Sequence, residues 1–424
     1  MKQEMEICDF GLQSHLQEVG FSVEKDGGCL INYLNTPINF GFPKHFYEYA
    51  TPQEGNQYFP LKKKYLLSST VDKEGRFEIL TQKYPERYAN RVLAWFTKIG
   101  EVTLDKEYTN NVFEAMCSQI QKQEPIKLGL IYSLQKFPLA DAGTDIKCLS
   151  PDPDISELEF FHSFWSINEV IKKEVYPLGL KIKIYNESTP FKHFPSPYGT
   201  DGLKVFESKV KKWIDILGWG EVFEFGDLEV QCNKKPGYMK KVADKFSSYV
   251  AEFKDFGVED NPFIKAESRN VYLPGLGINA TQEMLLSFYS VGGFIPLAGI
   301  TCSYDSPEAS DMAIWSKVVE QAKHQAAYSR AFLNTRGDYG NVYEEGEIPV
   351  TITKSGNKIT LPTCSKKAQE ILTHWNGGGV TVFPTAGVGV MTPSGIGVLP
   401  VYRALKVFQK VKYSDALGIN YLSL

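Results

Sequence analysis

Charged side chains of both signs follow a run of residues that predicts a buried strand. Residues 126–134 (IKLGLIYSL) are almost entirely apolar, which is typical of a strand covered on both faces. The loop after this run contains Lys147, Asp154 and Glu157. The two carboxylates stand near an expected helix start, so a favourable interaction with the helix dipole and a role in a site explain them equally well. Lys147 lacks such a structural explanation, and we expect it to hold a phosphate or carboxylate group of a substrate.

A second loop with side chains that could take part in a reaction follows the expected strand at 180–185 (LKIKIY). It contains Glu187, His193 and Asp201. Ligands of open α/β sheets bind at the carboxyl ends of the strands, so the two loops together predict one site. His193 and His374 are the histidines best placed for acid–base work, because an imidazole titrates near neutral pH. For a single histidine, a structural role is the commoner alternative.

Several common kinds of site are absent from the sequence. It contains no H-E-x-x-H, no G-x-S-x-G, no P-loop and no set of kinase motifs. Its seven cysteines lie far apart without a C-x-x-C pair, so we expect neither a metal site nor a redox pair. The segment 273–279 (LPGLGIN) has only a lone G-x-G and follows no clear strand, so we expect no bound cofactor.

The composition limits the class of partner. The chain has 424 residues with 46 basic and 50 acidic side chains, and this mildly acidic balance disfavours nucleic acid. Its 43% of apolar residues suffices for a packed core, which argues against disorder. We see no secretory signal and no apolar window of about 18 residues, so we expect a cytoplasmic protein that acts on small molecules and not on a membrane. The oligomeric state is not predicted.

The elements that must position these side chains alternate along the chain after residue 105. Helices are expected at 111–121, 156–175 and 203–217, and strands at 126–134, 180–185 and 222–225. This alternation predicts an α/β fold: a Rossmann-like, mostly parallel sheet with flanking helices. We expect Ser156 to cap the second helix, with Glu159 completing a capping box. The lysines of strand 180–185 suggest an edge or a half-covered position.

The length predicts more than one folding unit, because a single core stops growing near roughly 250–300 residues. We expect a smaller α+β module at 1–104, which includes a helix at 86–99. The Rossmann-like catalytic domain is expected at 105–424, with a glycine-rich β region near its end.

The later part of the chain predicts three further features. Helices are expected at 238–253 and 312–333, and another around 402–411. The runs 348–353 and 357–361 are expected to form a hairpin, since Lys354-Ser355-Gly356 joins them.

The order of motifs resembles the pyoverdine/dityrosine biosynthesis family, which includes the isonitrile synthases. The run PIKLGLIYSLQKFP (125–138) is similar to the family's strand ending in F-P. Lys147 with CLSPDPDISE (148–157) is similar to its K-x-L-G-x-x-P-D-x-x-E. The segments 176–185 and 200–228 resemble the strand and the helix–strand unit that follow. Arg330 and the stretch 380–395 resemble, in order, the closing region of the family.

The resemblance implies a Rossmann-like enzyme of specialised metabolism without a redox cofactor. Such an enzyme joins the α-amino nitrogen of an amino acid to a carbon of ribulose 5-phosphate, giving an isonitrile or an N-formyl amino acid. A basic residue and helix N-termini would hold the sugar phosphate, and a base would take a proton from the ammonium group. Taking the loops and the resemblance together, we expect Lys147, Glu157, Glu187 and His374 to be catalytic, and Asp154, His193, Asp201, Arg330 and Thr392 to bind the substrates.

Three positions depart from the family pattern. Leu139-Ala140-Asp141 follows F-P where the family has a lysine, and Asn186-Glu187-Ser188 stands in place of S-D-G. Thr392-Pro393-Ser394-Gly395 replaces T-P-W-H. Two alternatives therefore stay open: a non-catalytic small-molecule-binding protein on the same scaffold, and a transferase or ligase of another reaction class.

Overall fold

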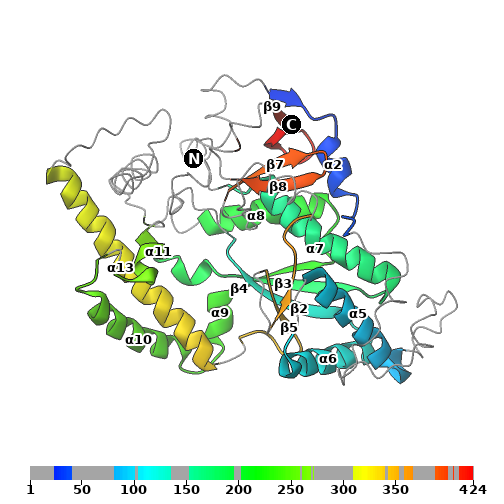
Figure 1. Cartoon of the computed structure of the whole chain (residues 1–424), viewed down its shortest axis with the longest axis horizontal. Helices are drawn as coiled ribbons and strands as arrows, with labels where there is room; N and C mark the ends of the chain where they lie inside the picture. The colour runs from blue at the N-terminus through cyan, green and yellow to red at the C-terminus, as the bar shows by residue number, and fades with distance from the viewer. Residues whose placement is uncertain are drawn as a thin grey trace.

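The part of the chain that the structure describes is organised by two five-stranded sheets (Figure 1). The computed structural model describes residues 23–40, 81–100, 104–134, 152–194, 202–257, 260–268, 271, 309–339, 342–352, 358–365, 387–399, 404 and 410–423. The parallel sheet consists of β2 (Ile126–Tyr132), β3 (Leu180–Asn186), β4 (Phe223–Asp227), β5 (Ile348–Thr351) and β6 (Ile359–Thr360). The mixed sheet consists of β1 (Val23–Lys25), β7 (Val388–Thr392), β8 (Gly395–Leu399), β9 (Lys410–Ser414) and β10 (Ile419–Ser423).

The parallel sheet has the strand order of a Rossmann fold. Its order is β4-β3-β2-β5-β6, and each neighbouring pair runs parallel. Counted along the chain from β2, this order is 3-2-1-4-5, in which the direction of winding switches between β2 and β5. The predicted α/β fold with a Rossmann-like parallel sheet is confirmed.

One prediction about the strands is wrong, and for β3 the structure decides between two alternatives. β5 and β6 do not form a hairpin, because they pair parallel with Val350 opposite Ile359. Alternating residues around a Ser-Gly link fit either strand direction, and only the pairing decides between them. β3 is an interior strand and not an edge, although its face is half covered as expected: Lys181 and Lys183 are ion-paired with Glu224 and Glu344 at 2.6 and 2.8 Å.

One face of the parallel sheet packs against helix α7 (Ile155–Glu174). The ring of Tyr132 in β2 stacks on Phe160 with centroids 4.4 Å apart, and Phe161 meets Phe223 of β4 edge-on at 5.0 Å. Also connected to this core are α2 (Cys29–Leu34), α5 (Pro85–Gly100), α6 (Lys106–Gln121) and α8 (Gly202–Ile216). The opposite face of the sheet therefore packs against helices that follow β4 in the sequence.

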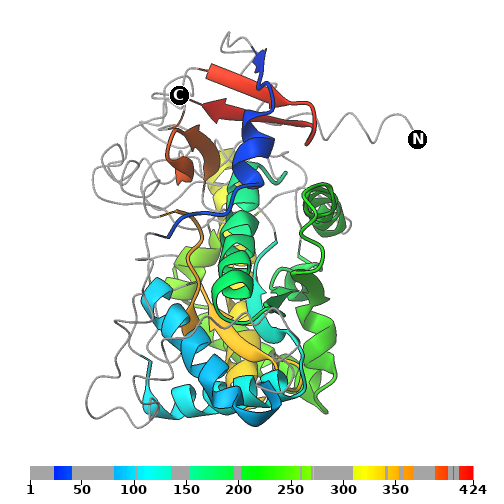
Figure 2. The ribbon, with the colours of Figure 1, turned by 90° about the vertical axis from the view of Figure 1, so that its right-hand side faces the viewer.

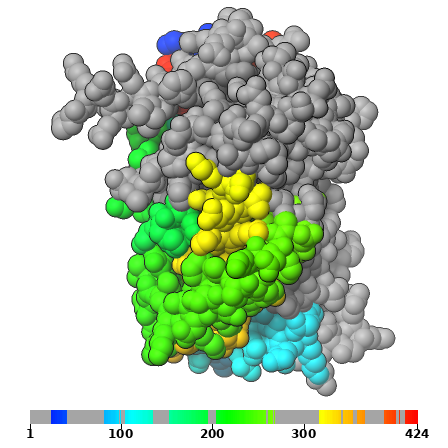
Figure 3. Space-filling view, turned by 90° about the vertical axis from the view of Figure 1, so that its left-hand side faces the viewer, coloured from blue at the N-terminus to red at the C-terminus, as the bar shows by residue number. Residues whose placement is uncertain are grey.

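The helices on that side are α9 (Leu228–Asn233), α10 (Tyr238–Phe253), α11 (Pro262–Ser268) and the long α13 (Ala309–Tyr339). Figure 3 shows α13 and α10 side by side there. The Tyr238 hydroxyl of α10 donates to the Phe332 carbonyl of α13 at 3.2 Å. Helix α13 is longer than the predicted 312–333 and reaches the level of the strands with its last turns. None of the described helices is long and apolar enough to cross a membrane.

The mixed sheet joins the two ends of the described chain. Strand β1 pairs parallel with β9, and the hairpins β7–β8 and β9–β10 meet through β10 and β7. In Figure 2 this sheet lies at one end of the molecule, next to α7. The helix expected around 402–411 is wrong at its end, because β9 begins at Lys410 and its backbone pairs with β10. The domain boundary at residue 104 stays a prediction.

The start of α7 lies two residues before the predicted cap. Asp154 is the N-cap and its carboxylate accepts from Ser156 N at 2.7 Å. Glu157 completes the capping box by accepting from Asp154 N at 2.8 Å. The expected Ser156–Glu159 box is therefore wrong, because the extended backbone at Asp154 already supplies the capping carboxylate. Glu159 takes no part in the cap, and its side chain points into the interior.

A buried polar junction forms around Glu159, which is completely inaccessible to solvent. The Tyr33 hydroxyl of α2 donates to both of its carboxylate oxygens at 3.0 and 3.1 Å, and Ser365 N donates at 3.2 Å. His162 Nδ1 lies 3.3 Å from Glu159, and His162 Nε2 bonds to the Thr36 carbonyl at 2.8 Å. The Glu159 junction thus links α7 to α2 and to the segment after β6.

We predict that Tyr33→Phe lowers the free energy of unfolding by about 1–3 kcal/mol, because the buried Glu159 carboxyl loses its hydroxyl donor. Chemical denaturation of the wild type and the variant measures the change. Tyr84→Phe is the matched control, since Tyr84 is 46% exposed. Equal losses in the two variants would contradict a role for the junction.

Candidate functional site

The carboxyl ends of β2 and β3 form a fixed polar corner. Asn186 Oδ1 accepts from Leu134 N at 3.2 Å and from Ser188 N at 3.0 Å, which holds both loop starts. The hydroxyls of Ser133 and Ser188 are 2.6 Å apart. Two adjacent hydroxyls at the strand ends can donate to and accept from a small polar ligand.

Glu187 follows β3 directly and faces a cation from the long helix. Its backbone N–H donates to the Tyr132 carbonyl at 2.9 Å, so its position relative to β2 is fixed. Its Oε1 lies 3.4 Å from Arg336 Nη1 in the last turns of α13. The two side chains are 38% and 27% exposed, so a small ligand can reach both charges.

The switch point between β2 and β5 is half covered on the α13 side. Ile131, Pro349 and Thr351, which share that face by register, are only partly buried. On the α7 side, in contrast, Leu130 and Val350 are fully buried. The surface next to Arg336 is therefore the accessible part of the region where Rossmann folds bind ligands.

The segment between α13 and β5 is held by a buried hydrogen bond under this surface. The Tyr185 hydroxyl donates to Glu347 Oε2 at 2.5 Å, and Glu344 N donates to the same oxygen at 2.9 Å. Burial raises the pKa of the Glu347 carboxyl. Tyr343 of the same segment lies over Gly129 of β2, where any Cβ would overlap its ring.

The structure places only some of the predicted site residues at the strand ends. Glu187 lies there as expected. Asp154 and Glu157 cap α7 with their carboxylates, and Asp154 Oδ1 also accepts from Gly389 N of β7 at 3.1 Å. The first turn of α7 is thus occupied by the chain's own carboxylates and by β7, which leaves no room for a phosphate as an N-terminal helix ligand.

Arg330 points to the helices and not to the strand ends. It is ion-paired with Glu252 of α10 at 2.7 Å, and its guanidinium lies 4.4 Å from the ring centroid of Tyr249. His193 follows β3 and its imidazole lies against the rings of Phe194 and Tyr328. These rings shield it from water on one side, which lowers its pKa, while the rest of the side chain is exposed.

Thr392 closes the β7–β8 turn. Its hydroxyl donates to the Gly395 carbonyl at 2.8 Å and accepts from Ser394 N at 3.1 Å. Lys147, Asp201 and His374 lie outside the described residues.

Sequence reasoning missed Ser133, Ser188 and Arg336 as candidate site residues. The two serines carry a usable signal, because each stands within two residues of a strand's carboxyl end. Arg336 carries none, since a basic residue in a helix is ordinarily a solvated surface group.

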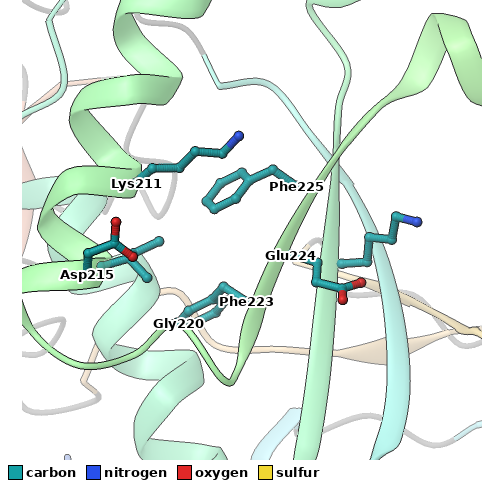
Figure 4. Close-up of a pocket in the computed structure, with 8 residues that line it drawn as sticks. Lys211, Asp215, Gly220, Phe223, Glu224 and Phe225 are labelled. Carbon is teal, nitrogen blue, oxygen red and sulfur yellow. The ribbon is translucent and has the colours of Figure 1, made fainter.

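A separate hollow of about 380 Å³ lies beside the edge strand β4 (Figure 4). Lys211 and Asp215 of α8 face Phe223 and Phe225 across it, and Lys211 Nζ lies 5.1 Å from the Phe225 ring centroid. It sits at the sheet edge, beside α8, and not at the strand ends that form the polar corner.

Comparison with known proteins shows that this chain is similar to a solved structure in its fold and shows nothing more. No protein-family model matches the sequence, and no curated protein sequence matches it. The structure is similar to the crystal structure of the PvcA protein from Pseudomonas aeruginosa, with a TM-score of 0.47 and 15% sequence identity. The match covers 80% of this chain and 99% of that chain. At this level of similarity, no residue's role is transferred to this chain.

We predict that Glu347→Gln removes a pH dependence of stability. Since burial raises the Glu347 pKa, the unfolded chain loses this proton near its ordinary pKa of about 4.3, before the folded chain does. The free energy of unfolding of the wild type therefore falls as pH rises from that value through the raised pKa. Glutamine still accepts from Tyr185 and from Glu344 N but does not titrate.

Denaturation between about pH 4 and about pH 8 checks this difference in slope. The exposed Glu345→Gln serves as the control and is expected to keep the wild-type slope. A Glu347→Gln variant with an unchanged slope would show that this carboxyl is not the cause.

Proposed function

We propose that this protein is an enzyme that modifies the α-amino group of an amino acid in the manner of the isonitrile synthases, with ribulose 5-phosphate as the carbon donor. The sequence resemblance over residues 111–230 motivates the reaction. The Rossmann order of the parallel sheet supplies the scaffold on which that segment is built.

The observation that carries the proposal is the position of Glu187 beside Arg336 and the serine pair. A carboxylate with one loosely held cation at 3.4 Å and 38% exposure can accept a hydrogen bond from a substrate ammonium. The same carboxylate can then take a proton from that ammonium, which frees the nitrogen lone pair for attack on a carbonyl carbon. The hydroxyls of Ser133 and Ser188 would bind oxygen atoms of the substrates.

The remaining assignments of the resemblance stay predictions within this proposal. Lys147 would hold the sugar phosphate, and His374 would assist proton transfer. Asp201 and His193 would contact the substrates. Glu157, Asp154 and Thr392 would act through the positions of α7 and of the β7–β8 turn, where their side chains are engaged. Arg336, and not Arg330, is the arginine of α13 that we place in the site.

The direct test is incubation with the standard amino acids and ribulose 5-phosphate, followed by mass spectrometry of the products. We expect one amino acid to be converted to its isonitrile or N-formyl derivative. Thermal-shift binding of an amino acid without any turnover would instead favour a non-catalytic binding protein. A requirement for ATP or S-adenosylmethionine would favour a ligase or transferase of another class.

We predict that Glu187→Gln lowers kcat by about 10²- to 10⁴-fold, because the amide cannot accept the ammonium proton. Product formation under saturating substrates measures the loss, and the thermal midpoint reports whether the variant is folded. Glu221→Gln, an exposed carboxyl before β4, is the control and should keep full activity. Full activity of the Glu187→Gln variant would contradict a role of Glu187 in the reaction.

A further inference from the structure

Strand β4 is an edge of the parallel sheet, and its outer side is open. The Val222 carbonyl accepts from Ile182 N of β3 at 2.7 Å. Because the N–H and C=O groups of successive residues in a strand point to opposite sides, those of Phe223 and Phe225 point away from β3. No described strand pairs with them. β4 therefore presents backbone donors and acceptors at the spacing that a further strand requires.

The other three edges of the described sheets are less suited to pairing with a partner. β6 has two residues, and both are buried. β8 is buried along its whole length, and β1 has three residues. β4 has five residues, of which only the first is buried, so it is long and accessible enough to pair with an extended segment.

The hollow of about 380 Å³ lies along this open edge, between β4 and α8 (Figure 4). The rings of Phe223 and Phe225 line it on the side of the strand. Asp215 of α8 lies across from them, and its Oδ1 is 3.7 Å from the point at which a Cβ on Gly220 would stand. The hollow thus combines aromatic rings with a carboxylate from the helix.

Asp215 is the charged residue of the hollow that lacks a partner. It is exposed, and no described residue forms an ion pair or a hydrogen bond with its carboxylate. The other charged side chains that line the hollow are ion-paired at 2.6 to 2.8 Å: Lys183 with Glu344, Lys211 with Glu207, and Glu224 with Lys181. A negative charge is therefore left over, and it is complementary to a cationic group of a partner.

We propose that β4 is a docking edge for an extended, basic segment of a partner protein, which adds to the sheet as a further strand. Hydrogen bonds to the backbone of Phe223 and Phe225 attach the segment. Residues opposite each other in neighbouring strands share a face of the sheet, so the side chain opposite Phe223 lies on the side of its ring. A lysine or arginine there packs its apolar stem on the ring and directs its charged end to Asp215.

A second copy of this chain does not fit the edge. In an antiparallel pair of two β4 strands centred on Glu224, the two Glu224 side chains stand opposite each other, and like charges in such a pair are destabilising. The strand itself (FEFGD) also contains no cation for Asp215. The docking edge does not depend on the proposed reaction, because the hollow is separate from the strand ends at which Glu187 lies.

We predict that the full chain binds a capped seven-residue peptide of alternating threonine and valine with a lysine at its centre. Asp215→Asn should weaken this binding about three- to tenfold, because a charge-assisted hydrogen bond is lost. Glutamate in place of the lysine should weaken binding to the wild type by at least as much. Fluorescence anisotropy of the labelled peptides measures both effects. Asp244→Asn, an exposed residue of α10, is the control and should bind like the wild type. Equal binding of the lysine and glutamate peptides, or no binding of either, would overturn the docking edge.

A second measurement tests the addition of a strand. Only every second residue of the peptide directs its N–H to β4, so N-methylation of one alternating set of residues should abolish binding, and N-methylation of the other set should not. The amides of Phe223 and Phe225 should exchange hydrogen more slowly when the peptide is bound. Equal effects of the two methylation patterns, or equally tight binding of N-acetyl-lysine amide, would indicate a site for a small cation and would overturn strand addition. Neither measurement involves turnover, so failure of the proposed reaction would leave these results unchanged.

Discussion

The arrangement of the described chain depends on satisfying one fully buried carboxyl group, that of Glu159. A buried carboxyl without hydrogen-bond partners is strongly unfavourable, and no water reaches this one. Its donors come from Tyr33 and Ser365, which are distant in sequence from α7 and from each other. Helix α2 and the segment after β6 must both dock on α7 before this group is satisfied.

The same junction relates the mixed sheet to the strand ends. The Ser365 hydroxyl donates to the Ser394 carbonyl in the β7–β8 turn at 3.2 Å, and Gly389 of β7 donates to the cap of α7. A Cβ at Gly389 would overlap the first turn of α7, so the close approach requires glycine. The mixed sheet therefore closes the α7 side of the carboxyl edge, while the α13 side at the switch point stays half covered.

Because the α7 side is closed and the α13 side is half covered, the charged residues fall into two groups. Those of the first group stabilise the fold, and those of the second group can be reached by a ligand. On the α7 side, Asp154 and the buried Glu157 accept hydrogen bonds from backbone N–H groups, so they stabilise the helix start. On the α13 side Glu187 and Arg336 are partly exposed, and their closest charged atoms are 3.4 Å apart. Accessible charges at the strand ends of a Rossmann fold are the physical feature from which a ligand site can be argued, independently of any likeness to another protein.

The sequence by itself determined the helices and strands of the central region. Apolar runs and helical spacing at 126–134, 156–175, 180–185 and 203–217 correspond to β2, α7, β3 and α8, and their alternation determined the parallel sheet. Glu187 was found for the same reason, since a residue that directly follows such a strand must lie at the carboxyl edge. The direction of β6 relative to β5 was not determined, because the alternation of apolar and polar residues is the same in parallel and antiparallel strands.

Only the tertiary structure decided which charges belong to the site. Arg330 and Arg336 stand six residues apart on one helix, and at about 100° per residue they point to different sides. Packing of α13 against α10 turned Arg330 toward Glu252 and left Arg336 for Glu187. Likewise, Asp154 and Glu157 could have served a ligand or a helix end, and the docking of β7 onto α7 decided for the helix end. The sequence thus determines which charged side chains the protein has. Whether such a side chain can bind a ligand depends on the neighbours with which the fold pairs it.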